Sequence, residues 1–293
     1  MSKSKAGVRI REGEGVRGET SSDEEESVHE ATRLSARLIY EVIRRYGEQE
    51  LLRPLNSLIW SGVAAGILIS FSVVGEAVLR TYLPDSPPSF LIENAGYSLG
   101  FVIVILGRMQ LFTENTITTV LPVVANRDLR SLIAMLRLWS VVLTANIVGT
   151  LAAGYFLTID GAFDPQLQVA FLELSHHATG MGTWQSFLRA IPAGVLVASI
   201  VWMMPSEKGG GFVIIFAFTW LIAAGDFTHI IAGSVEMAYL LWLGELGASA
   251  ALLDFFLPVL FGNIIGGTVI FTMLAWGQVK NEVVHGTGED GRG

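Results

Sequence analysis

Long stretches without a charged side chain are the feature of this sequence that most limits its fold. Residues 54–75 and 138–159 contain no Asp, Glu, Lys or Arg, and the same holds for 190–206, 209–225 and 255–279. At about 1.5 Å per helical residue, the first two windows reach roughly 33 Å, which is enough to cross the hydrocarbon core of a bilayer. Only 16% of the residues are charged, whereas a soluble domain carries about 25%. The sequence therefore predicts an all-α membrane protein.

The charge-free windows and their apolar flanks predict six transmembrane helices, at 57–79, 90–125, 136–158, 187–204, 209–245 and 251–277. Two of these spans contain polar interruptions. Gly107-Arg108 and Glu114-Asn115 interrupt the second span, and Gly225-Asp226 with His229 interrupts the fifth. A broken helix exposes backbone N–H and C=O groups, which a membrane protein tolerates only where they line a cavity or are buried. Both breaks are therefore expected inside the protein.

The composition divides the chain into four parts. These are a disordered acidic tail (1–30), a cytoplasmic amphipathic helix (31–56), a transmembrane channel domain (57–279) and a disordered C-terminal tail (280–293). The helix mixes apolar residues at helical spacing with arginines, so it should lie on the membrane surface, against a neighbouring subunit or against its own membrane domain.

Lysine and arginine predict the orientation. They precede span one, fill the loop between spans two and three, and occur again after spans four and six: Arg44, Arg45, Arg53, Arg127, Arg130, Arg137, Lys208 and Lys280. The opposite side has only Arg80 and Arg189. The positive-inside rule then places both termini in the cytoplasm and the protein in the inner (plasma) membrane, in contact with the lipid bilayer.

A local pattern repeats between the two halves. Phe112-Thr113-Glu114 matches Phe227-Thr228-His229 at an offset of 115, and Asn146-Ile147-Val148-Gly149 matches Asn263-Ile264-Ile265-Gly266 at an offset of 117. Each half has three spans, so the halves form inverted repeats, and paired breaks in such repeats point to a substrate pathway at the midplane. The alternative is that the breaks are kinks and that Asn146, Gly149, Asn263 and Gly266 serve only helix packing.

Four segments in the same order resemble the formate/nitrite transporter family: Gly107–Asn115, Ala198–Met203, Gly225–Ala232 and Pro258–Gly267. The resemblance is stronger to an uncharacterised inner-membrane branch of the family than to the formate channels. It implies an aquaporin-like fold of six helices and a homopentamer with one pore in each protomer. It also implies transport of small monovalent anions such as formate and nitrite, without a cofactor.

The resemblance also implies roles for single residues. His229 matches the family's central histidine and Thr113 the threonine of the first break. Tyr97 and Phe101 fall where the family narrows the cytoplasmic side, and Ile222 where it narrows the periplasmic side.

Three positions depart from the formate channels. Glu114 places a carboxylate beside Thr113 and, with Asn115, belongs to the expected pore residues. Gly194 and Ala178 stand roughly where those channels carry an Asn and a vestibule Lys. Glu114 could pair with Arg108, or it could face His229 and share a proton or hold a cation.

The sequence thus predicts a passive or proton-coupled pore for weak-acid anions, with His229 as gate and proton donor. Two alternatives stay open: a pore for ammonium or another cation or neutral solute because of Glu114, and a non-conducting scaffold or sensor. An enzyme is not expected, since hydrolase, P-loop and dinucleotide motifs are missing. A net charge of −8 argues against nucleic acid. No metal site is expected, because Cys is absent and His176-His177 is expected in a solvated loop.

Overall fold

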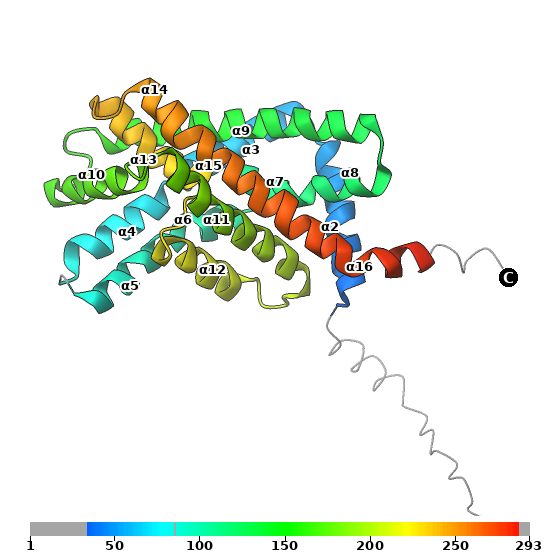
Figure 1. Cartoon of the computed structure of the whole chain (residues 1–293). Helices are drawn as coiled ribbons and strands as arrows, with labels where there is room; N and C mark the ends of the chain where they lie inside the picture. The colour runs from blue at the N-terminus through cyan, green and yellow to red at the C-terminus, as the bar shows by residue number, and fades with distance from the viewer. Residues whose placement is uncertain (1–33, 85, 287–293) are drawn as a thin grey trace, which may run out of the picture. The chain divides into compact units, whose positions relative to one another are not determined.

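The computed structural model describes residues 34–84 and 86–286, and within these ranges the regular structure is helical, without strands (Figure 1). Five helical stretches are long and apolar enough to cross a membrane: Leu55–Tyr82, Pro87–Leu106, Leu129–Leu157, Thr183–Ser206 and Ala248–Glu282. The all-α membrane fold predicted from the sequence is confirmed. The acidic tail predicted over residues 1–30 lies outside the described residues.

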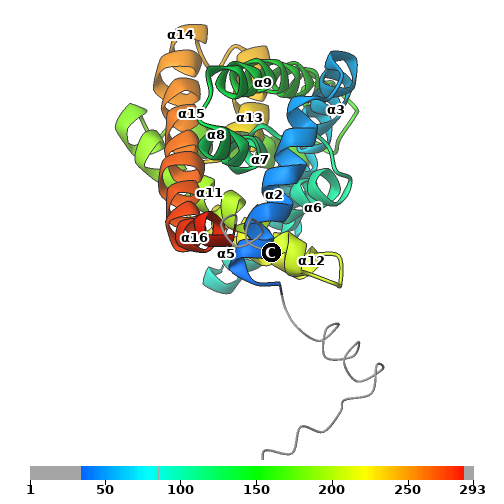
Figure 2. The same cartoon turned by 90° about the vertical axis from the view of Figure 1, so that its right-hand side faces the viewer.

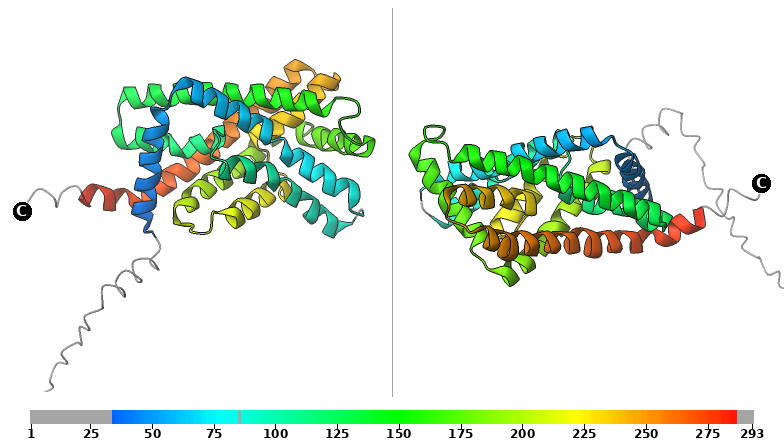
Figure 3. Two further views of the ribbon diagram at one scale, coloured as in Figure 1. Left: turned by 180° about the vertical axis from the view of Figure 1, so that it is seen from behind. Right: turned by 90° about the horizontal axis from the view of Figure 1, so that it is seen from above.

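The unbroken spans are built from seven α-helices with short 3₁₀ and π segments. Span one is α3 (Leu55–Leu68) with α4 (Phe71–Tyr82), span three is α9 (Leu129–Leu157), and span four is α11 (Thr183–Met203) with η1 (Met204–Ser206). Span six is one long rod (Figures 1 and 3), which consists of α14 (Ala248–Ala250), η2 (Ala251–Phe256), α15 (Leu257–Ile264), η3 (Ile265–Thr272) and α16 (Met273–Gly286).

The C-terminal boundary differs from the prediction. The tail was expected from residue 280, but α16 continues to Gly286, because residues 280–286 contain neither Pro nor a Gly before the last position to end a helix. Residues 287–293 lie outside the described part of the chain.

Spans two and five are the broken ones. Span two consists of α5 (Pro87–Gly96) and α6 (Ser98–Leu106), then a break, then α7 (Phe112–Thr118) and α8 (Val120–Asn126). Span five consists of α12 (Phe212–Ala224), a break, and α13 (Ile230–Leu243). Figure 2 shows α7 in the middle of the bundle, where it contacts α9, α11 and η3. The short helices are therefore enclosed by the longer ones, as the exposed backbone of a break requires.

The two halves pack in the same way. In the first half α3 lies along α9, and in the second half α11 lies along α15 and η3. Each pair joins the first and third spans of its half. The broken span of each half reaches the centre beside that pair, which fits the repeat predicted from the sequence.

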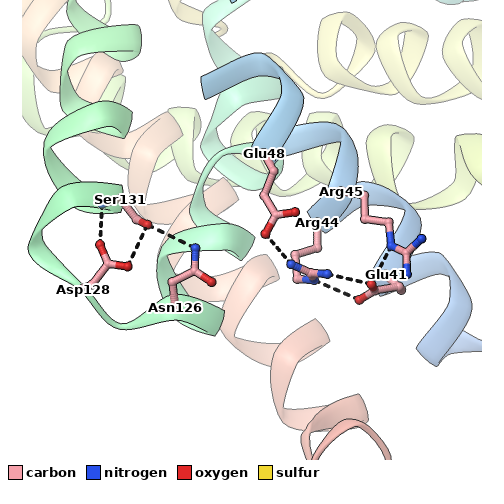
Figure 4. A network of polar contacts seen from close by, with 7 residues as sticks. All are labelled: Glu41, Arg44, Arg45, Glu48, Asn126, Asp128 and Ser131. Carbon is pink, nitrogen blue, oxygen red and sulfur yellow. Dashed lines mark hydrogen bonds and ion pairs between the residues drawn. The ribbon is translucent and has the colours of Figure 1, made fainter. Parts of the chain in front are cut away.

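Helix α2 (Ala36–Leu51) packs against its own membrane domain, one of the three placements that the sequence allowed. Its N-cap is Ser35, and its buried residues Tyr40 and Ile43 contact the cluster formed by Ile117, Leu121, Ala198, Val201 and Val279. The polar side of α2 carries a network of ion pairs in which Arg44 binds Glu41 and Glu48, and Arg45 binds Glu41 (Figure 4). These guanidinium groups lower the pKa of Glu41 to about 2.

A helix that the sequence analysis missed follows span three. Asp164 accepts a hydrogen bond from the Gln166 N–H, and Pro165 occupies the first turn of α10 (Pro165–Thr179). Both residues are typical helix starters. The placement of His176-His177 in a loop was wrong, because both lie in the last turn of this helix. Figures 1 and 3 show α10 and α2 at opposite ends of the bundle.

Candidate functional site

The two breaks have the same backbone path, 118 residues apart. Arg108 and Asp226 both adopt left-handed φ angles, of 52° and 54°. The hydrogen bonds across each break also correspond: Met109 N–H donates to the Val104 carbonyl (3.0 Å), and Phe227 N–H donates to the Ile222 carbonyl (2.9 Å). Left-handed backbone is uncommon outside glycine. Its occurrence at equivalent positions therefore marks the two breaks as copies of one structural element.

Asn146 of α9 holds the first break in place. Its Nδ2 donates to the carbonyls of Gly62 (2.8 Å) in span one and Gln110 (2.8 Å) in the break, and its Oδ1 accepts from the N–H of Phe112 (2.9 Å) at the start of α7. One buried amide thus joins all three spans of the first half and satisfies backbone groups that the break leaves open.

Asn263 of α15 does the same for the second break. Its Nδ2 donates to the carbonyls of Ala190 (2.7 Å) in span four and Thr228 (3.0 Å) in the break, and its Oδ1 accepts from the N–H of Ile230 (2.8 Å) at the start of α13. The Asn residues of the sequence repeat therefore bridge equivalent backbone atoms in both halves.

These bridges correct the register of the repeat at the breaks. The sequence comparison matched Phe112-Thr113-Glu114 with Phe227-Thr228-His229, an offset of 115. In the structure Phe112 corresponds to Ile230, because each donates its N–H to the bridging Asn, and the offset is 118. The apparent match arose from chance identity of Phe-Thr, and His229 corresponds to Leu111.

Small residues allow the spans that carry these Asn residues to approach closely. A Cβ on Gly149 would lie 2.4 Å from the Val63 carbonyl oxygen, and a Cβ on Gly266 would lie 2.1 Å from that of Ile191. A Cβ on Gly194 would lie 2.3 Å from the Asn263 carbonyl oxygen. Gly194 therefore lies in a helix contact with no room for a side chain.

His229 and Thr113 meet where the two half-helices begin. Thr113 Oγ1 lies 2.7 Å from His229 Nε2, and each residue is 1% exposed. His229 is also the N-cap of α13, since its Nδ1 accepts from the Ala232 N–H at 3.2 Å. An accepting Nδ1 places the proton of a neutral imidazole on Nε2. His229 therefore donates to the Thr113 hydroxyl, whose own proton stays available to a third group.

Aromatic rings cover the histidine. The Phe101 ring meets the His229 ring edge to face at a centroid distance of 4.8 Å, and Tyr97 lies 5.3 Å from Phe101. Phe101 is fully buried. The imidazole is thus enclosed by apolar surface, in which a neutral solute crosses far more easily than an ion.

Two cavities approach this centre from opposite ends of the bundle. The first, here called the α2 vestibule, has a volume of about 320 Å³ and is lined by Tyr46 of α2, Arg108 and Glu114 among others. The second, the α10 vestibule, has a volume of about 60 Å³ and reaches His229 itself, with His177 of α10 in its wall. It shares Glu76, His177 and Asp226 with an adjoining hollow of about 460 Å³.

Tyr97 and Ile222, two of the residues expected to narrow the pore, lie at other places than the resemblance implied. Tyr97 was placed on the cytoplasmic side, the side also predicted for α2, but it lines the α10 vestibule at the other end of the bundle. The error arose because span two runs from the α10 end toward α2, so Tyr97 precedes Phe101 and Ile105 along the path. Ile222 is fully buried next to the second break and lines neither vestibule.

Glu114 and Asn115 both line the α2 vestibule. Within residues 34–84 and 86–286, the Glu114 carboxylate forms no ion pair with Arg108 and no hydrogen bond with His229, so neither expected partner is in contact with it. Asn115 is buried and donates to Gln110 Oε1 (3.2 Å) and the Leu111 carbonyl (3.2 Å). Gln110 in turn donates to Glu50 of α2 (2.6 Å), which ties the first break to the amphipathic helix.

The sequence analysis missed three polar residues of the α10 vestibule: Glu76, Thr228 and Glu236. Glu76 directly follows the charge-free window 54–75 and is buried. Glu236 lies inside the apolar run of α13. An acidic residue in such a run is a functional candidate by default, so this signal was present in the sequence.

The fold and the central site define a multi-pass membrane protein in which two broken spans meet at a buried polar pair. Comparison with known proteins assigns its family: residues 37–277 match the formate/nitrite transporter family, and the chain belongs to it. The resemblance inferred from the sequence is confirmed. This is a family of channels and transporters rather than enzymes.

Relatives and solved structures agree with this assignment. The chain is 42% identical over 248 residues to the inner membrane protein YfdC of Escherichia coli (strain K12), covering 85% of this chain and 80% of the relative. It is 27% identical over 244 residues to the formate channel FocA of Haemophilus influenzae, covering 74% and 84%.

Among solved structures, a pentameric formate channel with formate bound has a TM-score of 0.62 at 22% identity, covering 76% of this chain and 96% of that one. An FNT family ion channel has a TM-score of 0.70 at 18% identity, covering 83% and 98%. These structures show the fold.

Proposed function

We propose that this protein forms a pore for small monovalent weak-acid anions such as formate or nitrite, with passive or proton-coupled flow. The observation that carries the proposal is the contact of His229 with Thr113 between two vestibules. Membership of the formate/nitrite transporter family supports a small anion as substrate.

His229 is the central gate. Its Nε2–H and the Thr113 hydroxyl form the polar point in a path otherwise walled by apolar side chains such as Phe101. An anion that reaches them accepts hydrogen bonds or a proton. Neutralising the anion lowers the free-energy barrier to the apolar sections, because transfer of an unpaired ion into apolar surroundings is very unfavourable.

The functional unit is a homopentamer with one pore in each protomer, in line with the pentameric formate channel that shares the fold. Both termini lie in the cytoplasm. The excess of Lys and Arg next to α2 and in the loop between spans two and three supports this orientation. The α10 vestibule then faces the outside.

Uptake of labelled formate or nitrite into proteoliposomes tests the proposal. Wild-type protein is expected to transport the anion, and His229→Ala is expected to abolish most of the flux. Because His229 also caps α13, His229→Asn separates the two roles, since Asn is a good N-cap but lacks the imidazole. His176→Ala, which changes a half-exposed histidine of α10, is the matched control. Equal flux in wild type, His229→Asn and empty vesicles contradicts the proposal.

A second candidate is a pore for ammonium or another small cation or neutral solute. The Glu114 carboxylate in the α2 vestibule favours it, because this group has no ion-pair partner in the part of the chain that the structure describes and a fixed negative charge attracts cations and repels anions. Reversal potentials in opposed formate and ammonium gradients separate the two candidates by the sign of the permeating charge. If Glu114 excludes anions, Glu114→Gln increases the formate conductance.

A further inference from the structure

The α10 vestibule contains two acidic side chains that have no partner in the described part of the chain. Glu76 of α4 and Glu236 of α13 line the cavity and are 9% and 7% exposed. The structure records neither a hydrogen bond nor an ion pair for either carboxyl group. Buried carboxylates are normally paired with a cation, and an unpaired one takes up a proton instead.

The basic groups around the cavity are engaged by other carboxylates. Arg80 pairs with Glu93 (3.6 Å) and Glu173 (3.2 Å). Arg189 and His177 both pair with Asp226, at 2.9 and 2.8 Å. The charged and titratable groups around Glu76 and Glu236 are therefore Arg80, Glu93, Tyr97, Glu173, His177, Asp226 and His229, with Arg189 bound to Asp226. Both arginines are already neutralised by carboxylates.

Thr228 provides an independent sign of a ligand in the same cavity. Its backbone is fixed, because its N–H donates to the Arg189 carbonyl (3.2 Å) and its C=O accepts from Asn263 (3.0 Å). Its hydroxyl is buried without a hydrogen-bond partner among the described residues, the residue is 6% exposed, and it lines the vestibule. An unsatisfied buried hydroxyl destabilises a protein, and a bound oxygen-containing solute removes this penalty.

We propose that Glu76 and Glu236 are held protonated and that they donate a proton to the transported weak acid while the Thr228 hydroxyl holds that acid in the α10 vestibule. In the transfer, an O–H bond of the glutamic acid breaks and an O–H bond forms on the anion. The carboxylate left behind recovers a proton from hydronium or buffer acid of the external solution, which reaches it through the adjoining hollow and leaves its conjugate base outside. The inference rests on the proposed function, since it names the source of the proton for that pore.

Glu76 and Glu236 lie on the outer side of His229, where an entering anion needs a proton. The anion meets this pair before His229 and Phe101, so the solute is already neutral when it reaches the apolar section. Among the residues that the structure describes, no lysine or arginine side chain lines the α10 vestibule, where Ala178 occupies part of the wall. A vestibule with carboxyl groups and no fixed cation attracts anions poorly. An anion that takes a proton from these carboxyl groups becomes neutral and can move on.

The pH dependence of uptake tests the inference. Formate uptake into proteoliposomes is measured against external pH for wild type, Glu76→Gln, Glu236→Gln and the control Glu245→Gln, a half-exposed acid that pairs with His176 outside the vestibule. In the two vestibule variants, uptake is expected to fall about tenfold per pH unit, as the neutral fraction of the acid does in bulk water. Uptake by wild type and by Glu245→Gln is expected to fall less steeply, because the pair supplies the proton.

A second variant controls for a purely structural effect of the two Glu→Gln substitutions. Thr228→Val retains both carboxyl groups, so it is expected to lower uptake roughly fivefold at every pH through one lost hydrogen bond of about 1 kcal/mol, without changing the slope. Infrared spectroscopy provides a readout without transport: the band of protonated carboxyl groups at neutral pH is expected in wild type and reduced in Glu236→Gln.

The outcomes separate the two proposals. If wild type transports formate but Glu76→Gln and Glu236→Gln retain its pH profile, or conduct more at every pH, the proton-donating pair is refuted and the pore stands. An infrared spectrum that Glu236→Gln leaves unchanged also refutes the pair. If wild type transports no weak acid, the proposed function fails, and with it the role of the pair in transport.

Discussion

Thr113 Oγ1 and His229 Nε2 lie 2.7 Å apart, although the two residues belong to different halves of the chain and are separated by 116 positions. The contact exists because the N-terminal ends of α7 and α13 meet in the centre of the bundle. Each end is held by the side chain of one Asn, Asn146 for α7 and Asn263 for α13.

Replacing Thr113 by Val is expected to leave the His229 Nε2–H buried without an acceptor. Such a group destabilises a protein by about 1–3 kcal/mol, and a change of 1.4 kcal/mol corresponds to about tenfold in an equilibrium constant. We expect a lower thermal midpoint in detergent and roughly tenfold less formate flux. Thr113→Ser retains the hydroxyl and should behave like wild type, so equal losses in both variants would show that the methyl group matters and the hydrogen bond does not.

The Asn146→Ala and Asn263→Ala variants are expected to lose similar amounts of stability, since each removes three equivalent hydrogen bonds. At about 1 kcal/mol per bond, the free energy of unfolding should fall by roughly 3 kcal/mol in each. Chemical denaturation in detergent measures this. Asn126→Ala, which loses one exposed hydrogen bond to Ser131, should lose less. A large difference between Asn146→Ala and Asn263→Ala would contradict the equivalence of the two halves.

Adding a methyl group at Gly194 or Gly266 is expected to force the packed spans apart. The new Cβ would lie 2.3 Å from the Asn263 carbonyl oxygen in one case and 2.1 Å from the Ile191 carbonyl oxygen in the other. Overpacking of this kind destabilises by about 1–3 kcal/mol. Gly277→Ala in α16, where no atom lies within 4 Å of the added Cβ, is the matched control and should not lower the thermal midpoint.

The ion pairs of Glu41 predict a small, pH-dependent contribution to stability. The pKa of Glu41 is lowered to about 2 by Arg44 and Arg45, so the stabilisation is present above its unfolded value of about 4.3 and is lost as the pH falls through the folded value. The pairs are largely exposed and screened, so Glu41→Gln should reduce stability at neutral pH by less than about 1 kcal/mol. The difference from wild type should vanish near pH 2 and in high salt. Glu282→Gln, an exposed acid of α16, should have no such pH-dependent effect.

The sequence alone predicted the membrane class, the six spans, the two breaks and the family, because charge-free windows and the interruptions within them follow directly from the cost of burying charge. It also identified Asn146 and Asn263 as a repeated pair, and in the structure each binds the backbone N–H that begins a half-helix. It could not place the register of the breaks, because Phe-Thr recurs at an offset that differs from the structural one by three residues. It also missed α10, which begins at Asp164-Pro165.

Only the tertiary structure decided which polar groups meet. Thr113 reaches His229, whereas its neighbour Glu114 projects into the α2 vestibule, because successive residues of a helix point in directions about 100° apart. Glu76, Thr228 and Glu236 come from three different segments and share a cavity only after α4, α10 and α13 pack together. Hydropathy fixes which segments enter the membrane, while the side chains that share a cavity depend on the rotation and packing of each helix, which a linear pattern does not encode.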